Sequence, residues 1–235
     1  MTESPLNWQD YAKQCEYEFP NPLDSQFSNS DLVCVGGDLE IPTLIYAYSK
    51  ALFPMHISSE ENFDAKQIGW FSPNQRCIFT KENLRITKSL KKSYNKFTYA
   101  INQQFETVMR MCMDITRPHG WIDEEFIDAY VKLHEEGFAH SFETYFDDKL
   151  VGGLYGVSFS GLFAGESMFH TVTDSSKCAL LFLMETLEKS SIDLLDAQWH
   201  TPHLESLGAI TISKSDYIYK LDKALDSQSY LLTDN

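Results

Sequence analysis

The chain has 235 residues, 43% apolar and 14% aromatic, so it can build a packed core and is not disordered, collagen-like or coiled-coil. Its longest uncharged run, residues 150–165, is shorter than a membrane-spanning helix and rich in Gly and Ser, which argues against a membrane protein. The net charge of −15 disfavours a polyanionic partner unless the basic residues gather in one patch.

Proline positions and polar stretches define the elements of the first third of the chain. Residues 1–31 are polar and contain three prolines, which predicts an irregular segment with a short helix around Trp8. A helix is predicted from Pro42, which suits a first turn, until Pro54 stops it. Residues 56–67 are polar and predict a loop.

The chain is expected to divide near residue 73 into a small N-terminal domain (residues 1–73) and a larger C-terminal domain (residues 74–235). In the larger domain the predicted strands are residues 76–80, 97–101, 140–146, 150–159, 162–169 and 192–199. The predicted helices are residues 87–95, one marked by Phe105 to Cys112, one capped by Asp123 and ended by Gly137, and one capped by Asp174 or Ser175. This order predicts an α+β fold with a mixed sheet flanked by helices, a hairpin turning at Ser160-Gly161 and a frayed tail from about Asp226.

One segment departs from the acidic average. Residues 81–96 contain six basic residues and one acidic residue, a local charge of +5, with Lys88, Lys91 and Lys92 on one helical face. Clustered cations on one element are typical of a phosphate-binding surface. The alternative is an ordinary solvated helix face.

Two polar sites stand in apolar surroundings. Glu166 lies near the end of a predicted central strand, and burying a carboxylate is costly unless it is paired or used. Asp196 and Gln198 are two apart on a predicted strand, so they are expected to point to the same side, where the carboxylate orients the amide. The alternatives are a structural ion pair or turn for Glu166, and a solvated strand end for the other two.

Other features are less specific. Trp121 follows a loop and suits stacking on a base, although a core position is the more common role of such a residue. The sequence has neither G-x-x-x-x-G-K-[ST] nor G-x-G-x-x-G, and no G-x-S-x-G. His200 and His203 have no third ligand at metal spacing, so neither a metal nor a cofactor is predicted. Five scattered cysteines without C-x-x-C, and no export signal in residues 1–10, predict a cytoplasmic protein with reduced thiols.

Ordered sequence blocks connect these features to a known family. The chain resembles the leucyl/phenylalanyl-tRNA–protein transferases from about Phe19 to Ser213. The blocks include Val35-Gly36-Gly37-Asp38-Leu39, Trp70-Phe71-Ser72-Pro73, residues 133–141, residues 150–157, Gly165-Glu166-Ser167-Met168-Phe169, Asp196-Ala197-Gln198 and residues 203–209.

The resemblance implies a small N-terminal domain and a GNAT-like C-terminal domain. It also implies transfer of Leu or Phe, and less readily Met, from aminoacyl-tRNA to the N-terminal Arg or Lys of proteins, which creates an N-end-rule degradation signal. The residues matching the family's catalytic positions are Asp196, Gln198 and Glu166, and those matching its substrate-binding positions are Trp121, Tyr130, Leu154, Met168 and Leu195. We predict tRNA contacts at Arg85, Lys88, Lys91 and Lys92, and a monomer.

An aminoacyl ester is already activated, so this reaction needs no ATP and no cofactor. We hypothesise that the carbonyl oxygen of Gln198, oriented by Asp196, accepts a hydrogen bond from the attacking amine, and that Glu166 fixes groups nearby. The chain departs from the family at Met55-His56, where an aromatic residue usually follows Phe-Pro. Two alternatives stay open, a CoA-dependent GNAT acyltransferase and a non-catalytic module that binds RNA or protein N-termini.

Overall fold

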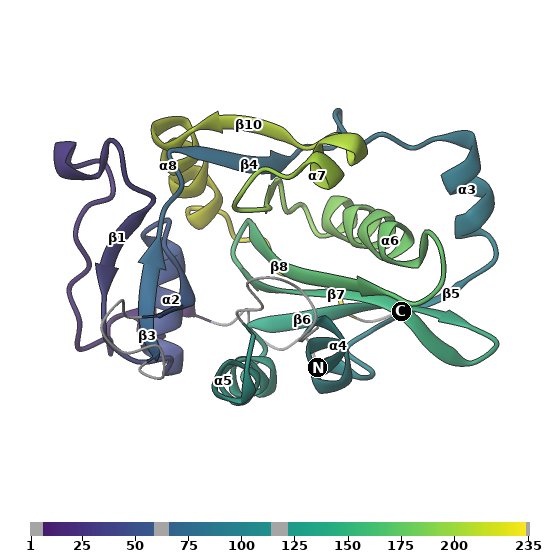
Figure 1. Cartoon of the computed structure of the whole chain (residues 1–235), viewed down its shortest axis with the longest axis horizontal. Helices are drawn as coiled ribbons and strands as arrows, with labels where there is room; N and C mark the ends of the chain where they lie inside the picture. Colours follow the sequence, from purple (N-terminus) through teal and green to yellow (C-terminus); the bar gives the residue numbers. More distant parts are fainter. Residues whose placement is uncertain (1–6, 59–65, 114–121, 234–235) are drawn as a thin grey trace.

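The computed structural model describes residues 7–58, 66–113 and 122–233. Within these residues the strands form a three-stranded sheet and a seven-stranded sheet. Figure 1 shows the smaller sheet at one end of the molecule, beside the larger one. The α+β class is therefore confirmed. No helix of the described residues is long and apolar enough to span a membrane.

The smaller sheet has the order β1-β3-β2 and is antiparallel. Its strands are β1 (Leu32–Val35), β3 (Lys66–Phe71) and β2 (Phe53–Ser58). The helical elements of this part are α1 (Trp8–Ala12), a 3₁₀ turn (Ser25–Phe27) and α2 (Ile41–Ser49). Pro42 lies in the first turn of α2, as predicted.

The prediction of a loop over residues 56–67 is wrong at both ends. Residues 53–58 and 66–71 pair as the antiparallel strands β2 and β3, and residues 59–65 lie outside the described part. Helix α2 ends at Ser49, before Pro54, and Ala51 then takes a left-handed conformation. Pro54 is compatible with β2 because this strand lies at a sheet edge, where one N–H needs no partner.

The larger sheet has the order β10-β4-β9-β8-β7-β6-β5, and only the β8–β9 pair is parallel among the described strands. The predicted mixed sheet is thus confirmed. Its strands in chain order are β4 (Gln75–Phe79), β5 (Thr98–Ile101), β6 (Ala139–Phe146), β7 (Lys149–Phe159), β8 (Leu162–His170), β9 (Leu194–Asp196) and β10 (Ile210–Ser213). The β7–β8 hairpin turns at Ser160-Gly161, as predicted.

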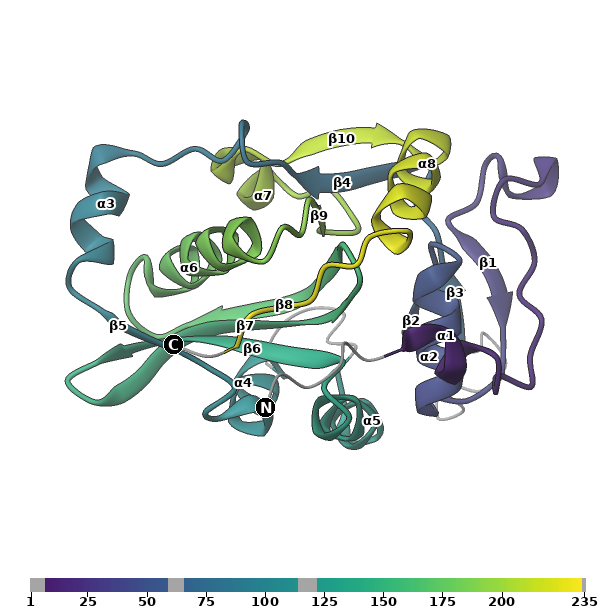
Figure 2. The same ribbon diagram turned by 180° about the vertical axis from the view of Figure 1, so that it is seen from behind.

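Helices cover both faces of this sheet (Figures 1 and 2). On one side lie α6 (Ser175–Lys189), α3 (Lys88–Tyr94) and α7 (Pro202–Leu207), and on the other α4 (Phe105–Cys112), α5 (Glu124–Glu135) and α8 (Lys214–Leu225). Strand alternation sends Ile78 and Leu194 into one core and their neighbours Phe79 and Leu195 into the other. The sheet therefore separates two apolar layers.

Helix ends follow local side-chain chemistry, with one correction. Asp123 caps α5 by accepting a hydrogen bond from the Phe126 N–H at 3.3 Å, and Gly137 follows its end with a positive φ, as predicted. Asp174 precedes α6 but makes no side-chain cap. Its Oδ2 instead accepts a hydrogen bond from Ser93 and its Oδ1 accepts one from Lys177, so both oxygens are used elsewhere.

Residues 226–233, which follow α8, are ordered against the body of the protein, contrary to the predicted fraying from about Asp226. The Ser229 hydroxyl donates to the Ser191 carbonyl at 2.7 Å, and the Leu232 N–H donates to the Ser190 hydroxyl at 3.0 Å. Figure 2 shows this segment following α8 past β8. The apolar Leu231 packs against the core, which offsets the entropy of ordering the tail.

Candidate active site

A cavity of about 270 Å³ lies against the α6 face of the larger sheet. Glu166, Asp196 and Gln198 line it together, although 32 residues separate Glu166 from Gln198. The predicted pocket residues Leu154, Met168 and Leu195 line the same cavity. Its remaining walls are Phe79, Tyr155, Gly165, Ser167, Leu180, Leu183, Ala197, Thr201, His203 and Leu204. An apolar chamber with an acid and an amide at one side is typical of a small-molecule site.

Glu166 reaches the cavity because β8 carries a bulge. Tyr155 pairs with Ser167 and Gly156 pairs with Gly165, which leaves Glu166 as the extra residue. Its Oε1 accepts hydrogen bonds from the Tyr48 hydroxyl at 2.7 Å and from Gln198 Nε2 at 2.8 Å. Its Oε2 is buried and has no hydrogen-bond partner among the described residues.

The pKa of Glu166 follows from this setting. Burial raises the pKa to about 8, against the hydrogen bond from Tyr48 that lowers it, and the charge of Asp196 adds to the rise. An unpaired buried oxygen on such a group is costly for folding. The carboxyl is therefore best explained by a ligand that supplies the missing hydrogen bond.

Two tyrosines, Tyr48 and Tyr130, form a chain of hydrogen bonds that ends on Glu166. The hydroxyls of Tyr48 and Tyr130 are 2.6 Å apart, and both side chains are buried. Burial, and then the charge of Glu166, raise the pKa of each phenol well above its usual value, so both stay protonated. Tyr130 is thus linked to Glu166 through Tyr48 and does not line the cavity. Tyr48 was not among the predicted site residues, and the signal for its role was a hydroxyl on the apolar face of α2.

Asp196 is the last residue of β9 and is completely buried. Arg76 donates two hydrogen bonds to this carboxylate, from Nε to Oδ1 at 2.8 Å and from Nη2 to Oδ2 at 2.5 Å. The Tyr217 hydroxyl donates to Oδ2 at 2.8 Å, and the Gln198 N–H donates to Oδ1 at 2.9 Å. The carboxylate is therefore fully occupied by the protein.

The expectation that Asp196 and Gln198 share one face of a strand is wrong. Strand β9 stops at Asp196, and Gln198 has a φ of 59°, which is a left-handed conformation. Asp196 accepts the main-chain N–H of Gln198, while the side-chain amide of Gln198 turns to Glu166. Alternation fails here because Ala197 and Gln198 both bond the main chain of Cys77 on β4, which places two residues opposite one, and the sequence does not mark that irregularity.

The predicted tRNA-binding residues are all exposed. Lys88, Lys91 and Lys92 lie on α3, which Thr87 caps and which packs against α6, and Arg85 precedes it. Lys81 is paired with Glu188. Figure 1 shows α3 at the end of the molecule opposite the smaller sheet. His203 also lines the cavity. Burial and the nearby basic groups Lys177 and His170 lower its pKa, so further basic groups lie close to the cavity.

Trp121 lies outside the described residues, so its place in the site stays a prediction.

The predicted histidines do not form a metal site with each other in the described part of the chain: His200 is paired with Glu205 at 3.3 Å, in an exposed position. A second histidine, His56, contacts Asp123 at 2.9 Å and Glu125 at 3.2 Å. Lys66 also contacts Asp123, at 2.8 Å, so the ammonium group of this lysine already supplies a positive charge beside the two carboxylates.

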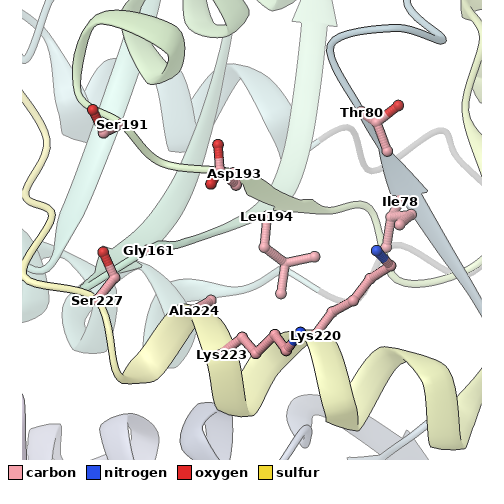
Figure 3. Close-up of a pocket in the computed structure, with 10 residues that line it drawn as sticks. All are labelled: Ile78, Thr80, Gly161, Ser191, Asp193, Leu194, Lys220, Lys223, Ala224 and Ser227. Carbon is pink, nitrogen blue, oxygen red and sulfur yellow. The ribbon is translucent and has the colours of Figure 1, made fainter.

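A second cavity, of about 210 Å³, lies on the other face of β4 and β9 (Figure 3). Ile78 and Leu194 line it, whereas their neighbours line the first cavity. Lys220 and Lys223 reach it from α8, and Asp193 from the segment before β9. It contains no predicted site residue and no buried acid, so we assign the chemistry to the first cavity.

Comparison with known proteins identifies the family of the chain. The family model described as leucyl/phenylalanyl-tRNA protein transferase matches residues 78–222, and the model of the N-terminal domain of the same family matches residues 37–74. Curated proteins with the name leucyl/phenylalanyl-tRNA–protein transferase are similar over nearly the whole chain. The protein from Shewanella piezotolerans is 37% identical over 97% of this chain and 98% of its own length, and that from Sulfurimonas denitrificans is 41% identical over 88% and 89%.

Among solved structures, a GCN5-related N-acetyltransferase-like protein from Streptococcus suis is 19% identical, with a TM-score of 0.32, and the match covers 59% of this chain and 58% of its own. The identity and coverage of the curated relatives are decisive on their own. The chain belongs to the leucyl/phenylalanyl-tRNA–protein transferase family.

Proposed function

We propose that this enzyme transfers Leu or Phe, and less readily Met, from aminoacyl-tRNA to the α-amino group of an N-terminal Arg or Lys. The product is an N-end-rule degradation signal. Family membership supports the reaction class. The observation that carries the assignment to this cavity is the unpaired, buried Oε2 of Glu166 beside the Gln198 amide, at the wall of an apolar chamber.

The reaction depends mainly on how the attacking amine is positioned against the aminoacyl ester. The amine nitrogen attacks the ester carbonyl carbon, the new C–N bond forms, the bond to the ribose oxygen breaks, and one amine proton ends on that oxygen. An α-ammonium has a pKa of about 7.7–8.0, so a neutral fraction exists near neutral pH and a strong base is unnecessary. Because Nε2 of Gln198 donates to Glu166, its carbonyl oxygen is the atom left to accept a hydrogen bond from the amine. The ionised form of Glu166, whose fraction grows as the pH approaches its pKa of about 8, offers Oε2 as a second acceptor.

The cavity walls suit an apolar side chain, either aliphatic or aromatic. Leu154, Met168 and Leu195 line it together with Leu180 and Leu183 from α6. A flexible methionine in such a wall adapts to side chains of different shape, which fits acceptance of Leu, Phe and Met. The overall charge of −15 favours approach of basic protein N-termini.

We assign the tRNA contact to the exposed basic side chains around α3. The Lys88→Ala/Lys91→Ala/Lys92→Ala variant is expected to bind tRNA more weakly and to reduce the slope of log affinity against log salt by roughly 2–3, because each lost phosphate contact removes about 0.7–0.9. Filter binding or anisotropy at several salt concentrations measures this slope. The matched control is Lys220→Ala/Lys223→Ala on α8, beside the second cavity. An unchanged slope in the α3 variant contradicts the assignment.

The proposed reaction is tested with tRNA charged with labelled Leu, Phe or Met and peptides that begin with Arg, Lys, Asp or Ala. We expect label on the Arg and Lys peptides only. Binding of tRNA without transfer would instead indicate a binding module, and a thermal shift with acetyl-CoA but not with aminoacyl-tRNA would indicate a CoA-dependent acyltransferase.

The enzyme is proposed to act as a cytoplasmic monomer. The five cysteines, which lie in described parts of the chain, form no disulfide bond. Light scattering is expected to give a mass near that of one 27.0 kDa chain.

The division into domains at residue 73 also remains our proposal. The two sheets support it, because their strands lie on either side of that position.

A further inference from the structure

The backbone of Gln198 is held in an unfavourable conformation. Its φ of 59° is uncommon for residues other than Gly, Asn and Asp. Two main-chain bonds hold it there: its N–H donates to Asp196 Oδ1 at 2.9 Å, and its carbonyl accepts from the Cys77 N–H of β4 at 2.9 Å. Such strain persists only where the surroundings over-determine it, and it is concentrated at functional sites.

The Asp196 carboxylate is in turn held by two residues distant in the sequence. Arg76 binds it through two nitrogens, and Tyr217 donates to Oδ2. The guanidinium lies between the rings of Phe53, at 4.8 Å, and Tyr217, at 4.3 Å, and its Nη1 donates to the Ala51 carbonyl at 3.3 Å. The three groups are almost completely buried. Burying a charged pair is seldom favourable for stability alone, which points to another role.

The hydrogen bonds to Asp196 show how the Arg76–Asp196–Tyr217 network reaches the cavity. Both oxygens of Asp196 are taken by Arg76, Tyr217 and the main chain, so a substrate atom finds no free acceptor on this carboxylate. The only group in the network that touches both Asp196 and the cavity carboxyl is Gln198, among the residues the structure describes. Burial, and then the charge of Asp196, raise the pKa of Tyr217 well above its usual value, so Tyr217 remains a donor.

We infer that Arg76 and Tyr217 are positioning residues for the transfer reaction, and that they act through the main chain of Gln198. They fix the Asp196 carboxylate, which fixes the Gln198 N–H, and the left-handed turn then directs the amide onto Glu166 beside the reacting amine. This inference rests on the proposed function. It makes helix α8 a part of the catalytic apparatus, because Tyr217 is on that helix.

Tyr217→Phe tests the inference with the smallest change. It removes one hydrogen bond to Asp196 and leaves the ring that covers Arg76. We expect kcat to fall about 10-fold, with KM for aminoacyl-tRNA unchanged, because the lost bond to a charged group positions only the reacting amide. Tyr145→Phe is the matched control, since its hydroxyl donates to the carboxylate of Glu143, at 2.7 Å and away from the cavity. It is expected to leave kcat unchanged.

A second variant shows whether Tyr217 acts through Gln198. Gln198→Asn shortens the amide while keeping a residue type that tolerates the left-handed conformation. In this background Tyr217→Phe is expected to have no further effect on kcat, whereas a general structural role predicts the same 10-fold loss again. Additive losses, or a Tyr217→Phe enzyme with full kcat, would overturn the inference.

A readout independent of transfer separates this inference from the proposed function. Hydrogen exchange of the Gln198 main-chain N–H, followed by NMR, is expected to be slow in the wild type and in Tyr145→Phe, and about 10-fold faster in Tyr217→Phe. Equal protection in all three proteins contradicts the positioning role even if transfer occurs. Loss of protection in Tyr217→Phe, together with no transfer by the wild type, contradicts the proposed function instead.

Discussion

The Glu166→Gln enzyme is expected to lose most of its activity and to gain stability at alkaline pH. The substitution keeps the acceptor for Tyr48 and Gln198 but cannot ionise, so it lacks the carboxylate form whose Oε2 accepts a hydrogen bond from the substrate amine. Loss of one preorganised group of this kind costs about 10²–10³-fold in rate. Transfer to an Arg peptide measures the loss.

The gain in stability follows from the raised pKa. In the folded protein the pKa of Glu166 is about 8, compared with an ordinary value of 4.5. Between these values the folded state holds a proton that the unfolded state has released, so the free energy of unfolding falls as pH rises from 4.5 through about 8. Glutamine has no such proton, and the variant should be more stable than the wild type by on the order of 5 kcal/mol above pH 8 and similar to it near pH 4.5.

Urea unfolding of both proteins at the two ends of this pH range measures the difference. Glu143→Gln is the matched control, because Glu143 is also completely buried but accepts hydrogen bonds from Ser141, Tyr145 and the Gln104 N–H. It is expected to destabilise the protein at both pH values. Equal stability of Glu166→Gln and wild type at high pH would show that Glu166 is not strained by burial.

Asp196→Ala is expected to abolish transfer and to lower the free energy of unfolding by about 3–5 kcal/mol, because it leaves the buried charge of Arg76 without a partner. The hydroxyl of Tyr217 and the N–H of Gln198 lose their acceptor at the same time. Urea unfolding measures this effect. Glu106→Ala serves as the control, since it breaks only the exposed pair with Arg110 and should cost less than about 1 kcal/mol.

Removing both charges separates stability from function. In Arg76→Met/Asp196→Ala no buried charge is left unpaired, so much of the lost stability should return. Transfer should remain lost, because Gln198 still has no acceptor for its N–H. Recovery of transfer along with stability would show that Asp196 acts only in folding, and an Asp196→Ala protein as stable as the control would contradict the buried-pair argument.

Most helices and strands of the larger domain were predictable because their information is local. Apolar spacing marks α4, α5 and α6, and caps such as Asp123 mark their starts. The β7–β8 hairpin is marked by two apolar runs around Ser160-Gly161. The β2–β3 hairpin was missed because Pro54 suggests a break, and only the sheet order shows that β2 is an edge strand that tolerates it.

The chemical groups available to this protein can be read from its amino-acid sequence. A carboxylate, Glu166, stands in an apolar run, and an acid and an amide, Asp196 and Gln198, end another. Family-like blocks around them indicated the reaction class, and the charge pattern indicated the basic segment that includes Lys88. These are properties of residue type and order, which need no coordinates.

How those groups work together depends on the three-dimensional fold. Tyr48 reaches Glu166 across 118 residues of chain, and Arg76 reaches Asp196 across 120. Burial, which sets the pKa of Glu166, and the left-handed backbone of Gln198 depend on contacts between distant elements. Local patterns carry no record of such contacts, because the energy of a buried polar group is fixed by what surrounds it in space and not by its neighbours in the chain.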